Sequence, residues 1–280
     1  MAGEKDQLPV AREGELTLGI VGGGSMGGAI ARGLVAAGTL PAERVLVADH
    51  GAQKRAALEA CGVRCFPEER SLLQEGPDVV VLAVKPQVLP GVLESAAPSV
   101  AGRLVVSIAA GVTLSTLEAA LPGARVVRVM PNLPVQVRSG ASAVSAGTLA
   151  TDQDVQLVSE LFSALGAVSV MREDQLDVAG AVVGTAPAFF SLFVDELTRA
   201  GVRAGLPAAA CRELVEATMR GCAEQLLTEG VHPREYMERV TSPGGTTAAA
   251  LFELEPPLAA GTYAAVDAAL ARTRELAGGK

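Results

Sequence analysis

Apolar side chains in residues 1–170 fall in short runs, and segments with helical spacing or glycine-rich turns separate them. The runs are rich in Val and Leu with few polar interruptions, which is typical of strands covered on both faces. The predicted strands are residues 16–21, 44–49, 77–84, 102–109, 124–130 and 140–148. The predicted helices are residues 25–37, 52–60, 113–121 and 151–165. This alternation predicts a doubly wound α/β domain.

The pattern changes near Asp174, after which helical periodicity replaces the strand-like runs. The predicted helices are residues 175–184, 187–204, 207–228, 232–239, 246–253 and 262–277. Prolines at positions 187, 207 and 233 stand where helices begin, a position that tolerates the missing N–H. We therefore expect a loose tail over 1–15, a nucleotide-binding domain over 16–170 and an all-helical domain over 171–280.

One helical stretch, residues 178–194, carries no charge and superficially resembles a membrane span. It is short for a bilayer, contains Gly180, Gly184 and Pro187, and is flanked by acidic residues. A helix buried in a core or in a subunit interface explains it better. The helices over 178–228 hold more Ala, Val and Leu than one small domain can bury, so we expect a homodimer, with assembly into a larger oligomer left open.

The composition of the chain argues against several classes of binding partner. The net charge of −8 argues against nucleic acid or an anionic membrane surface. Four cysteines and two histidines are too few and too scattered for a convincing zinc site, so no metal is expected and the cysteines are read as reduced thiols. The polar N-terminal segment lacks the apolar stretch of a signal peptide, which favours a cytoplasmic protein.

The first chemical motif is Gly22-x-Gly24-x-x-Gly27, directly after the first predicted strand and opening the first predicted helix. Glycines permit the tight turn and the close approach of a pyrophosphate, while the helix N-terminus supplies amides and a positive dipole. The motif alone is weak, because a structural glycine-rich turn looks the same. In this context it predicts dinucleotide binding.

Asp49, at the end of the second predicted strand, bears on the choice of cofactor. A carboxylate at this place accepts the ribose hydroxyls of NAD and repels a 2′-phosphate. His50, Lys54 and Arg55 follow closely and could instead hold that phosphate. The two cues conflict; we favour NADH slightly and leave NADPH open. Asp49 could also be only a solvated strand end.

Two further segments follow strands at the edge where open α/β sheets bind ligands. Val84-Lys85-Pro86-Gln87 offers a lysine to ribose or phosphate, although a surface Lys-Pro turn is the default reading. The segment 107–112, of mostly small residues, would let the nicotinamide ribose lie against the backbone, although such residues also serve close packing.

From Leu16 to about Leu276 the sequence resembles pyrroline-5-carboxylate reductases. The matching segments, in the order of that family, are GIVGGGSMGGAIARGL, VKPQ, SIAAGVT, RVMPNLP, AGVRAGL and VTSPGGTTAAALFELE. The resemblance implies a Rossmann-type domain followed by an all-helical C-terminal dimerisation domain. It also implies NADH or NADPH as reductant, pyrroline-5-carboxylate as substrate and L-proline as product, in proline biosynthesis.

The implied cofactor-binding residues are gathered at the ends of the predicted strands. They are Val21, Gly22, Gly23, Gly24, Ser25, Met26, Gly27, Asp49, Ala83, Val84, Lys85, Pro86, Ile108, Ala109, Ala110 and Asn132.

The segment 241–247, TSPGGTT, lies in a loop that enters a predicted helix, so its amides can form a cradle for a carboxylate. The implied substrate-binding residues are Ser242, Gly244, Gly245, Thr246 and Thr247. We expect Thr247 to be the catalytic residue that orients or protonates the imine nitrogen, with water sharing that role. The alternative is that Thr241 or Ser242 is an ordinary N-cap.

The chain departs from the family at several positions. Leu133 replaces a threonine, Thr185-Ala186 replaces Ser-Gly, and Phe189 replaces a tyrosine. Arg239 either supports carboxylate binding or faces solvent. These departures bear on substrate detail, including a related cyclic imine, rather than on the reaction class.

Two rival functions remain open. A β-hydroxyacid dehydrogenase would rely on a lysine in the helical domain, yet after Lys85 the only lysine is Lys280. A non-catalytic paralogue that binds the dinucleotide is favoured by the altered segment 184–189 and opposed by the intact segment 242–247.

Overall fold

The structure, a computed structural model, describes residues 16–277. The predicted tail over 1–15 lies outside the described residues. Backbone contacts divide the chain into two compact units, one running to Gly184 and resuming at Arg272, the other running from Thr185 to Ala271.

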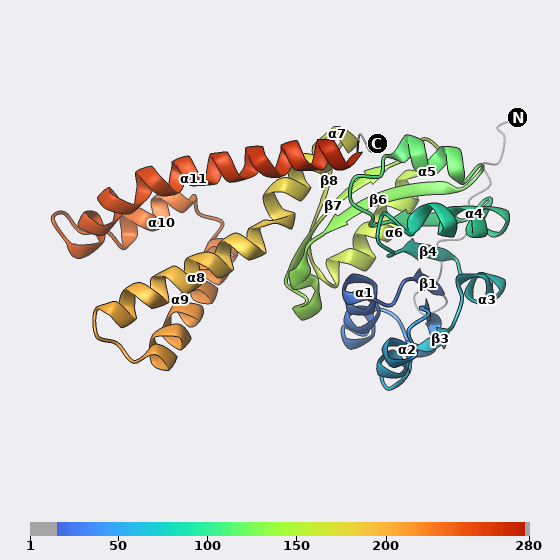
Figure 1. The fold of residues 1–280 in the computed structure, drawn as a ribbon, viewed down its shortest axis with the longest axis horizontal. Coiled ribbons are helices and arrows are strands. Elements are labelled where there is room, and N and C mark those ends of the chain that lie inside the picture. The colour runs from blue at the N-terminus through green and yellow to red at the C-terminus, as the bar shows by residue number, and fades with distance from the viewer. Residues whose placement is uncertain (1–15, 278–280) are drawn as a thin grey trace, which may run out of the picture. The chain divides into compact units, whose positions relative to one another are not determined.

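The first unit is built on one sheet with the strand order β3-β2-β1-β4-β5-β6-β7-β8 (Figure 1). The strands are β1 (Leu18–Val21), β2 (Val45–Ala48), β3 (Arg64–Phe66), β4 (Val79–Leu82), β5 (Leu104–Ser107), β6 (Arg125–Pro131), β7 (Gly140–Ala146) and β8 (Gly166–Val170). All neighbours are parallel except the antiparallel pair β6 and β7. The predicted α/β class is confirmed.

Alternate residues of each strand enter different cores, one on each face of the sheet. Ile20 and Val47 belong to one cluster, and their neighbours Val21 and Leu46 belong to the other. This double burial is why the strands appear as unbroken apolar runs in the sequence. The helices of the first face are α1 (Ser25–Ala36), α2 (Ala52–Glu59) and α6 (Asp152–Ser163); those of the second are α3 (Glu69–Gln74), α4 (Leu89–Val100) and α5 (Leu114–Ala120).

Four elements were missing from the sequence predictions: β3, β8, α3 and α4. β3 has only three residues and β8 is mostly exposed, so neither has the buried run that marks the central strands. α4 contains Pro90 in its first turn and Pro98 near its end. Because prolines usually mark the ends of helices, they made this segment look non-helical in the sequence. Pro98 is tolerated because the carbonyl that loses its partner belongs to exposed Glu94.

The chain after β8 stays with the sheet before it enters the second unit. α7 (Glu173–Ala179) and a π-helical turn (Gly180–Gly184) lie against β6 and β7. A Cβ on Gly180 would lie 3.0 Å from Met130 Cε, so this turn packs closely on the sheet. The functional division at residue 170 stays a prediction, while the contact boundary falls at Gly184.

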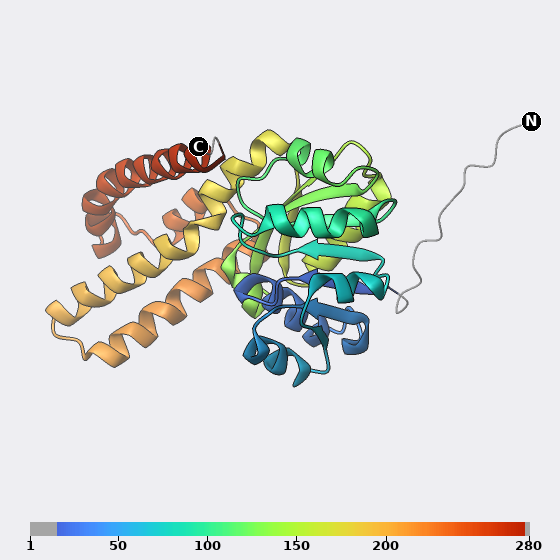
Figure 2. The ribbon, with the colours of Figure 1, turned by 45° about the vertical axis from the view of Figure 1, so that its right-hand side comes forward.

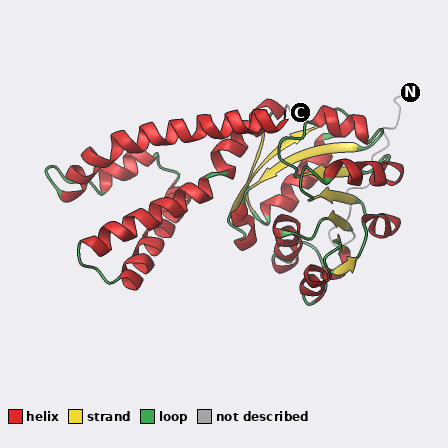
Figure 3. Cartoon of the chain, in the orientation of Figure 1, coloured by secondary structure: helices red, strands yellow, loops and turns green. Residues whose placement is uncertain are grey.

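The second unit is all helical in its described residues, as Figure 3 shows by colour. Its helices are α8 (Ala186–Arg203), α9 (Ala208–Glu229), α10 (Pro233–Arg239) and α11 (Thr246–Ala277), the last of which ends in the first unit. α8 and α9 pack side by side (Figure 2), and Gly201 lets Cys211 approach the α8 backbone.

The second unit leaves its large apolar side chains exposed. Cys211 is the one buried residue of α8, α9 and α10 taken together. Leu227 of α9 is 81% exposed and Phe252 of α11 is 80% exposed. Of the two explanations for the apolar segment 178–194, burial in a core of this single chain is therefore wrong for its α8 part.

By length and composition alone, one helical segment of the described residues, Glu173–Arg203, is apolar enough to cross a membrane. Its best 18-residue window has a mean hydropathy of 1.6, and 6% of that window is buried. A helix from a subunit interface passes the same test, so this is weak evidence for a span.

α11 corrects the prediction of two helices over 246–253 and 262–277. One helix runs through Pro256 and Pro257. Proline keeps a helical φ but has no N–H, so the carbonyls of Phe252 and Glu253 lose their helical donors. Both residues are exposed, and water can satisfy those carbonyls.

All four cysteines are free, as expected. Burial, followed by the charge of Glu59, raises the pKa of the Cys65 thiol to about 11. Cys65 is therefore a neutral thiol at pH 7 rather than a reactive thiolate.

Arg138 supplies a stability prediction. It ends the 3₁₀ turn Leu133–Val137 in the left-handed region, at φ 57° and ψ 32°, and its side chain is exposed. An L-residue costs roughly 1 kcal/mol there and glycine does not, so Arg138→Gly should raise the melting temperature by about 2 °C in thermal unfolding. Arg138→Ala keeps the strain and should leave the melting temperature unchanged; an equal rise in both variants would contradict the explanation.

Candidate functional site

The predicted dinucleotide residues lie at one edge of the sheet. β2, β1, β4, β5 and β6 are adjacent and parallel, so their carboxyl ends meet there. The chain leaves β1 toward β2 on one side and continues with β4 on the other, so the switch in strand order falls between β1 and β4. Open α/β sheets bind ligands in the crevice at this point.

Gly22 is required by the backbone itself. Its φ is +105°, and its N–H donates to the carbonyl of Ala48 at 2.8 Å. A Cβ would stand 2.6 Å from the carbonyl oxygen of Ala83 at the end of β4. Gly27 is equally constrained, because a Cβ there would collide with the Gly22 carbonyl. Packing alone explains these two glycines.

Gly24 is different, because a Cβ on it would meet nothing within 4 Å. It is the N-cap residue of α1, has an extended conformation that alanine also adopts, and provides no side-chain cap. There is thus open space beside the first turn of α1, whose amides lie at the positive end of the helix dipole. This is the geometry that a pyrophosphate needs, and the structural-turn explanation does not account for it.

Asp49 lies directly behind this turn. Its Oδ2 accepts from the N–H of Gly23 at 3.0 Å, and its Oδ1 accepts from the N–H of Gly51 at 2.7 Å. Partial burial opposes ionisation, but the hydrogen bonds from Gly51, Lys54 and Gly23 outweigh it and lower the pKa of Asp49. Asp49 is therefore a charged group tied to the glycine turn, not a free strand end.

The basic residues that follow are already engaged. Lys54 Nζ lies 3.1 Å from Asp49 Oδ2, with its side chain 54% exposed. Arg55 donates to the carbonyls of Asp49 and His50 at 2.7 and 3.0 Å, and His50 Nδ1 lies 2.8 Å from the carbonyl of Pro67. Lys54 is the more exposed of the two cations, whereas Arg55 braces the loop.

The segments after β4 and β5 lie at the same edge. The carbonyl of Lys85 accepts from the N–H groups of Val88 and Leu89 at 2.9 and 3.1 Å, while its side chain is exposed. After β5, Ile108 N–H donates to the carbonyl of Leu82 at 3.2 Å, and Ala110 is exposed. These two turns therefore present a cation and a small-residue backbone at the same edge of the sheet.

Asn132, also predicted to bind the cofactor, has both ends of its amide occupied in the structure. Its Nδ2 donates to the carbonyl of Val183 at 3.1 Å, and its Oδ1 accepts from the N–H of Ala141 at 2.8 Å. It joins β6 to β7 and to the π-helical turn. A direct cofactor contact would have to displace one of these bonds.

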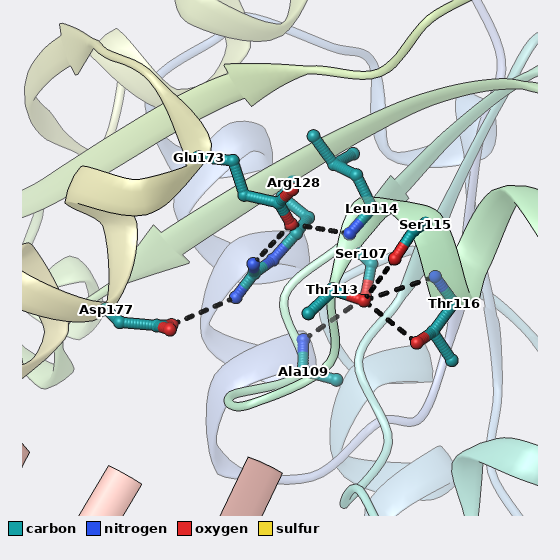
Figure 4. A network of polar contacts seen from close by, with 9 residues as sticks. All are labelled: Ser107, Ala109, Thr113, Leu114, Ser115, Thr116, Arg128, Glu173 and Asp177. Carbon is teal, nitrogen blue, oxygen red and sulfur yellow. Dashed lines mark hydrogen bonds and ion pairs between the residues drawn. The ribbon is translucent and has the colours of Figure 1, made fainter. Parts of the chain in front are cut away.

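The sequence analysis missed Arg128 and Glu173. Arg128 is 3% exposed in β6, and its guanidinium lies 2.7 Å from Glu173 and 3.4 Å from Asp177 (Figure 4). An arginine inside the apolar run 124–130 was the available signal, since a buried charge requires a partner. The partners stand 45 and 49 residues away, and only the fold brings them together.

The predicted substrate loop belongs to the second unit. The N–H of Gly245 donates to the carbonyl of Ser242 at 3.0 Å, and Gly244 has a φ of +70°. α11 then begins at Thr246, so its first amides and the hydroxyls of Thr246 and Thr247 lie at the start of a long helix.

Neither ordinary-cap alternative applies at the first turn of α11. Thr241 Oγ1 donates to the carbonyl of Met237 at 2.6 Å and so closes α10. Ser242 lies four residues before Thr246, ahead of the tight turn, and is exposed. Arg239 is held by Glu229 and Glu235, so it is paired rather than free to reach a ligand.

Two family models match the chain. Residues 17–111 match the model described as NADP oxidoreductase, coenzyme F420-dependent. Residues 173–276 match the model described as pyrroline-5-carboxylate reductase dimerisation. The two matches cover the sheet-edge turns and the segment 242–247, respectively.

Relatives match over nearly the whole chain. The pyrroline-5-carboxylate reductase of Glycine max is 39% identical over 272 residues, which are 96% of this chain and 98% of the relative. That of Synechocystis is 36% identical over 263 residues, or 93% and 98%.

Two solved structures share this fold. The structure of a pyrroline-5-carboxylate reductase from Coxiella burnetii has a TM-score of 0.88 at 34% identity, covering 93% of this chain and 98% of that one. The Plasmodium falciparum pyrroline carboxylate reductase, solved with NADP bound, has a TM-score of 0.83 at 28% identity, covering 94% and 98%.

Gly24 and Gly27 give a matched test of the turn. Gly24→Ala should fold normally but weaken NADH or NADPH binding by about tenfold, because the added methyl stands where the pyrophosphate approaches the amides. Cofactor affinity is measured by nicotinamide fluorescence, and folding by thermal unfolding. Gly27→Ala should lower the melting temperature because of its collision with the Gly22 carbonyl. Unchanged affinity in a folded Gly24→Ala protein would leave only the structural explanation of the turn.

Proposed function

The chain belongs to the pyrroline-5-carboxylate reductase family, and from that premise we propose that it reduces the C=N bond of 1-pyrroline-5-carboxylate to give L-proline. The hydride donor is NADH or NADPH. The protein is thus an oxidoreductase of proline biosynthesis. The observation that carries the proposal is the pair of glycine turns that lead into helix N-termini in one chain, at Gly24 before α1 and at Gly245 before α11. One suits a pyrophosphate, and the other suits a carboxylate.

The residues at the sheet edge fit a dinucleotide. The amides of α1 behind Gly24 would hold the pyrophosphate, Asp49 the adenosine ribose, and Lys85 the ribose or phosphate at the end of β4. The turn 108–110 would take the nicotinamide ribose along its backbone. When bound, the nicotinamide supplies a hydride to the imine carbon.

The loop at the start of α11 would take the substrate. Its carboxylate would accept from the amides of Thr246 and Thr247, with the hydroxyls of Ser242 and Thr246 adding hydrogen bonds. The imine nitrogen would take up its proton from solvent, and addition of the hydride to the iminium carbon then completes the amine. Orientation and exclusion of water provide most of the rate enhancement, since a protonated imine is already electrophilic.

Thr247 would orient the imine nitrogen. Its hydroxyl is half-buried in the first turn of α11, whose dipole favours a negative ligand over a free cation. The substrate carries both charges, so its carboxylate belongs at the amides and its iminium at the hydroxyl. A hydroxyl is a weak acid, so Thr247 would orient the nitrogen by accepting from its N–H, and water would supply the proton before the hydride is transferred.

Thr247 is tested by following nicotinamide absorbance with purified protein and pyrroline-5-carboxylate. The wild type should oxidise the reductant only when the imine is present. Thr247→Val keeps the shape and removes the hydroxyl, so kcat should fall by about a hundredfold with cofactor affinity unchanged.

Thr247→Ser keeps the hydroxyl and is the matched control, with most activity retained. Full activity in Thr247→Val would remove Thr247 from the mechanism. A wild type that binds cofactor but oxidises none would support the non-catalytic paralogue or a reductase of a related cyclic imine.

Asp49 would favour NADH over NADPH. Its carboxylate is charged, is held against the glycine turn by Gly23, and lies where a 2′-phosphate would add a second negative charge. Lys54 offsets part of that repulsion from 3.1 Å, so NADPH is disfavoured rather than excluded.

Asp49→Asn keeps an oxygen acceptor for the turn and removes the charge. The ratio of kcat/KM with NADH to kcat/KM with NADPH should fall by about tenfold, as like-charge repulsion ends. Because the pKa of Asp49 is lowered, its charge is present throughout pH 6 to pH 8, so its titration should add no pH dependence to the wild-type ratio in that range. Lys54→Gln should raise the ratio; a ratio that neither variant moves would contradict a role in cofactor choice.

The helical unit would complete its burial with a second copy of the chain. The exposed Leu227 and Phe252 and the apolar helix α8 give it a surface that a homodimer would cover. Pairing of dimers into a larger oligomer is left open. The net charge of −8 supports the absence of nucleic acid and of an anionic membrane as partners. A cytoplasmic location is part of the same proposal.

A further inference from the structure

Three polar residues cross the centre of the sheet in one row. Arg128 of β6 is the register partner of Ser107 on β5 and of Ser145 on β7. Paired residues of neighbouring strands share a face, so the three side chains lie on the same side of the sheet. All three are buried, with 1%, 3% and 3% of Ser107, Arg128 and Ser145 exposed. A full positive charge thus stands inside an otherwise apolar sheet.

That charge is neutralised from one helix. Glu173 and Asp177 stand one turn apart on α7, on the same face, and both reach the guanidinium of Arg128 (Figure 4). Removing one partner of a buried ion pair is costly, because the remaining charge stays desolvated. The pairing therefore fixes α7 on β6.

The two carboxylates differ in what else they contact. Glu173 Oε1 accepts from Arg128 Nη1 at 2.7 Å and also from the N–H of Leu114 at 2.5 Å. Leu114 is the first residue of α5 and directly follows the turn 108–113. Asp177 contacts Arg128 at 3.4 Å but makes no bond to that turn among the described contacts. Glu173 alone therefore links the turn to both β6 and α7.

The turn has few other fixed points. It starts at Ile108, whose N–H donates to the carbonyl of Leu82, and the N–H of Ala109 lies 3.4 Å from Ser107 Oγ (Figure 4). It reverses at Gly111, where φ is +74°. Thr113 caps α5 locally by accepting from the N–H of Thr116 at 3.2 Å. That cap is internal to α5, whereas the bond from Leu114 to Glu173 links the start of α5 to α7 and, through Arg128, to β6.

The same segment is held at its other end. Asn132, which directly follows β6, donates to the carbonyl of Val183. The stretch 173–184 is thus anchored on β6 near both ends, and its anchored carboxylate reaches the turn after β5. A carboxylate on a well-fixed helix holds a backbone N–H more firmly than one on a mobile loop.

We propose that Glu173 is a positioning residue for the turn 108–113, holding it in the conformation that takes the nicotinamide ribose. The inference rests on the proposed function for the cofactor role of that turn. Glu173 acts through Leu114 and does not touch the reacting atoms. Arg128 supports it by fixing the direction of its carboxylate.

Asp177→Asn is the matched control for Glu173→Ala, because both variants remove one carboxylate from Arg128 and only the second frees the turn. Both should lower the melting temperature. Glu173→Ala should raise the Kd for NADH, measured by fluorescence, by about tenfold, whereas Asp177→Asn should change it by less than about twofold. Glu173→Gln keeps an oxygen for the N–H of Leu114 and should restore most of the affinity.

Hydrogen exchange over residues 108–114 gives a second readout that needs no cofactor. Exchange there should be faster in Glu173→Ala than in the wild type and unchanged in Asp177→Asn. Equal effects of the two variants on exchange would overturn the proposal, since both would then act only through stability. A wild type that binds neither NADH nor NADPH, with faster exchange in Glu173→Ala, would instead refute the proposed function and retain the anchoring of the turn.

Discussion

The burial of both faces of the parallel sheet is the constraint on which the first unit depends. Each central strand contributes alternate residues, such as Ile20 and Val21, to two separate cores. Because helices cover both faces of the sheet, the polar groups that could bind a ligand lie at the ends of the strands. Parallel strands put their carboxyl ends at one edge, where the strand order reverses between β1 and β4 and where open α/β sheets bind ligands. The glycine turn, Asp49, Lys85 and the turn 108–113 all follow from this arrangement.

The charged side chains in and next to the sheet are neutralised by specific partners. Arg128 is tolerated in β6 because two carboxylates of α7 meet it, and Asp49 is tolerated behind the glycine turn because amides and Lys54 satisfy it. In both places the neutralising contacts also fix a backbone segment at the sheet edge. In this molecule, the contacts that neutralise a buried charge are thus also the contacts that hold a binding turn in place.

The second unit, in contrast to the first, buries little apolar surface within the chain. Its helices α8, α9 and α10 bury a single residue within the chain, and their apolar side chains face outward. Such a unit gains little from its own hydrophobic contacts, so its stability must come from a surface that covers it. The loop proposed to hold the substrate opens α11 in this unit. Its rigidity therefore depends on the same coverage.

The sequence by itself determined the class of fold, the strands of the central sheet and the glycine turn, because buried parallel strands are continuous apolar runs and a Gly22-x-Gly24-x-x-Gly27 turn is local. It could not reveal β3 and β8, whose exposure removes that signal, or the continuity of α11, since two prolines look like a break although exposed carbonyls tolerate them. From local spacing alone, Asp49 favoured NADH as cofactor, whereas Lys54 and Arg55 favoured NADPH. Only the tertiary structure paired Lys54 with Asp49 and turned Arg55 toward the backbone. It likewise brought Arg128 to Glu173 across 45 residues, because such a contact is decided by how β6 and α7 pack and not by any local pattern.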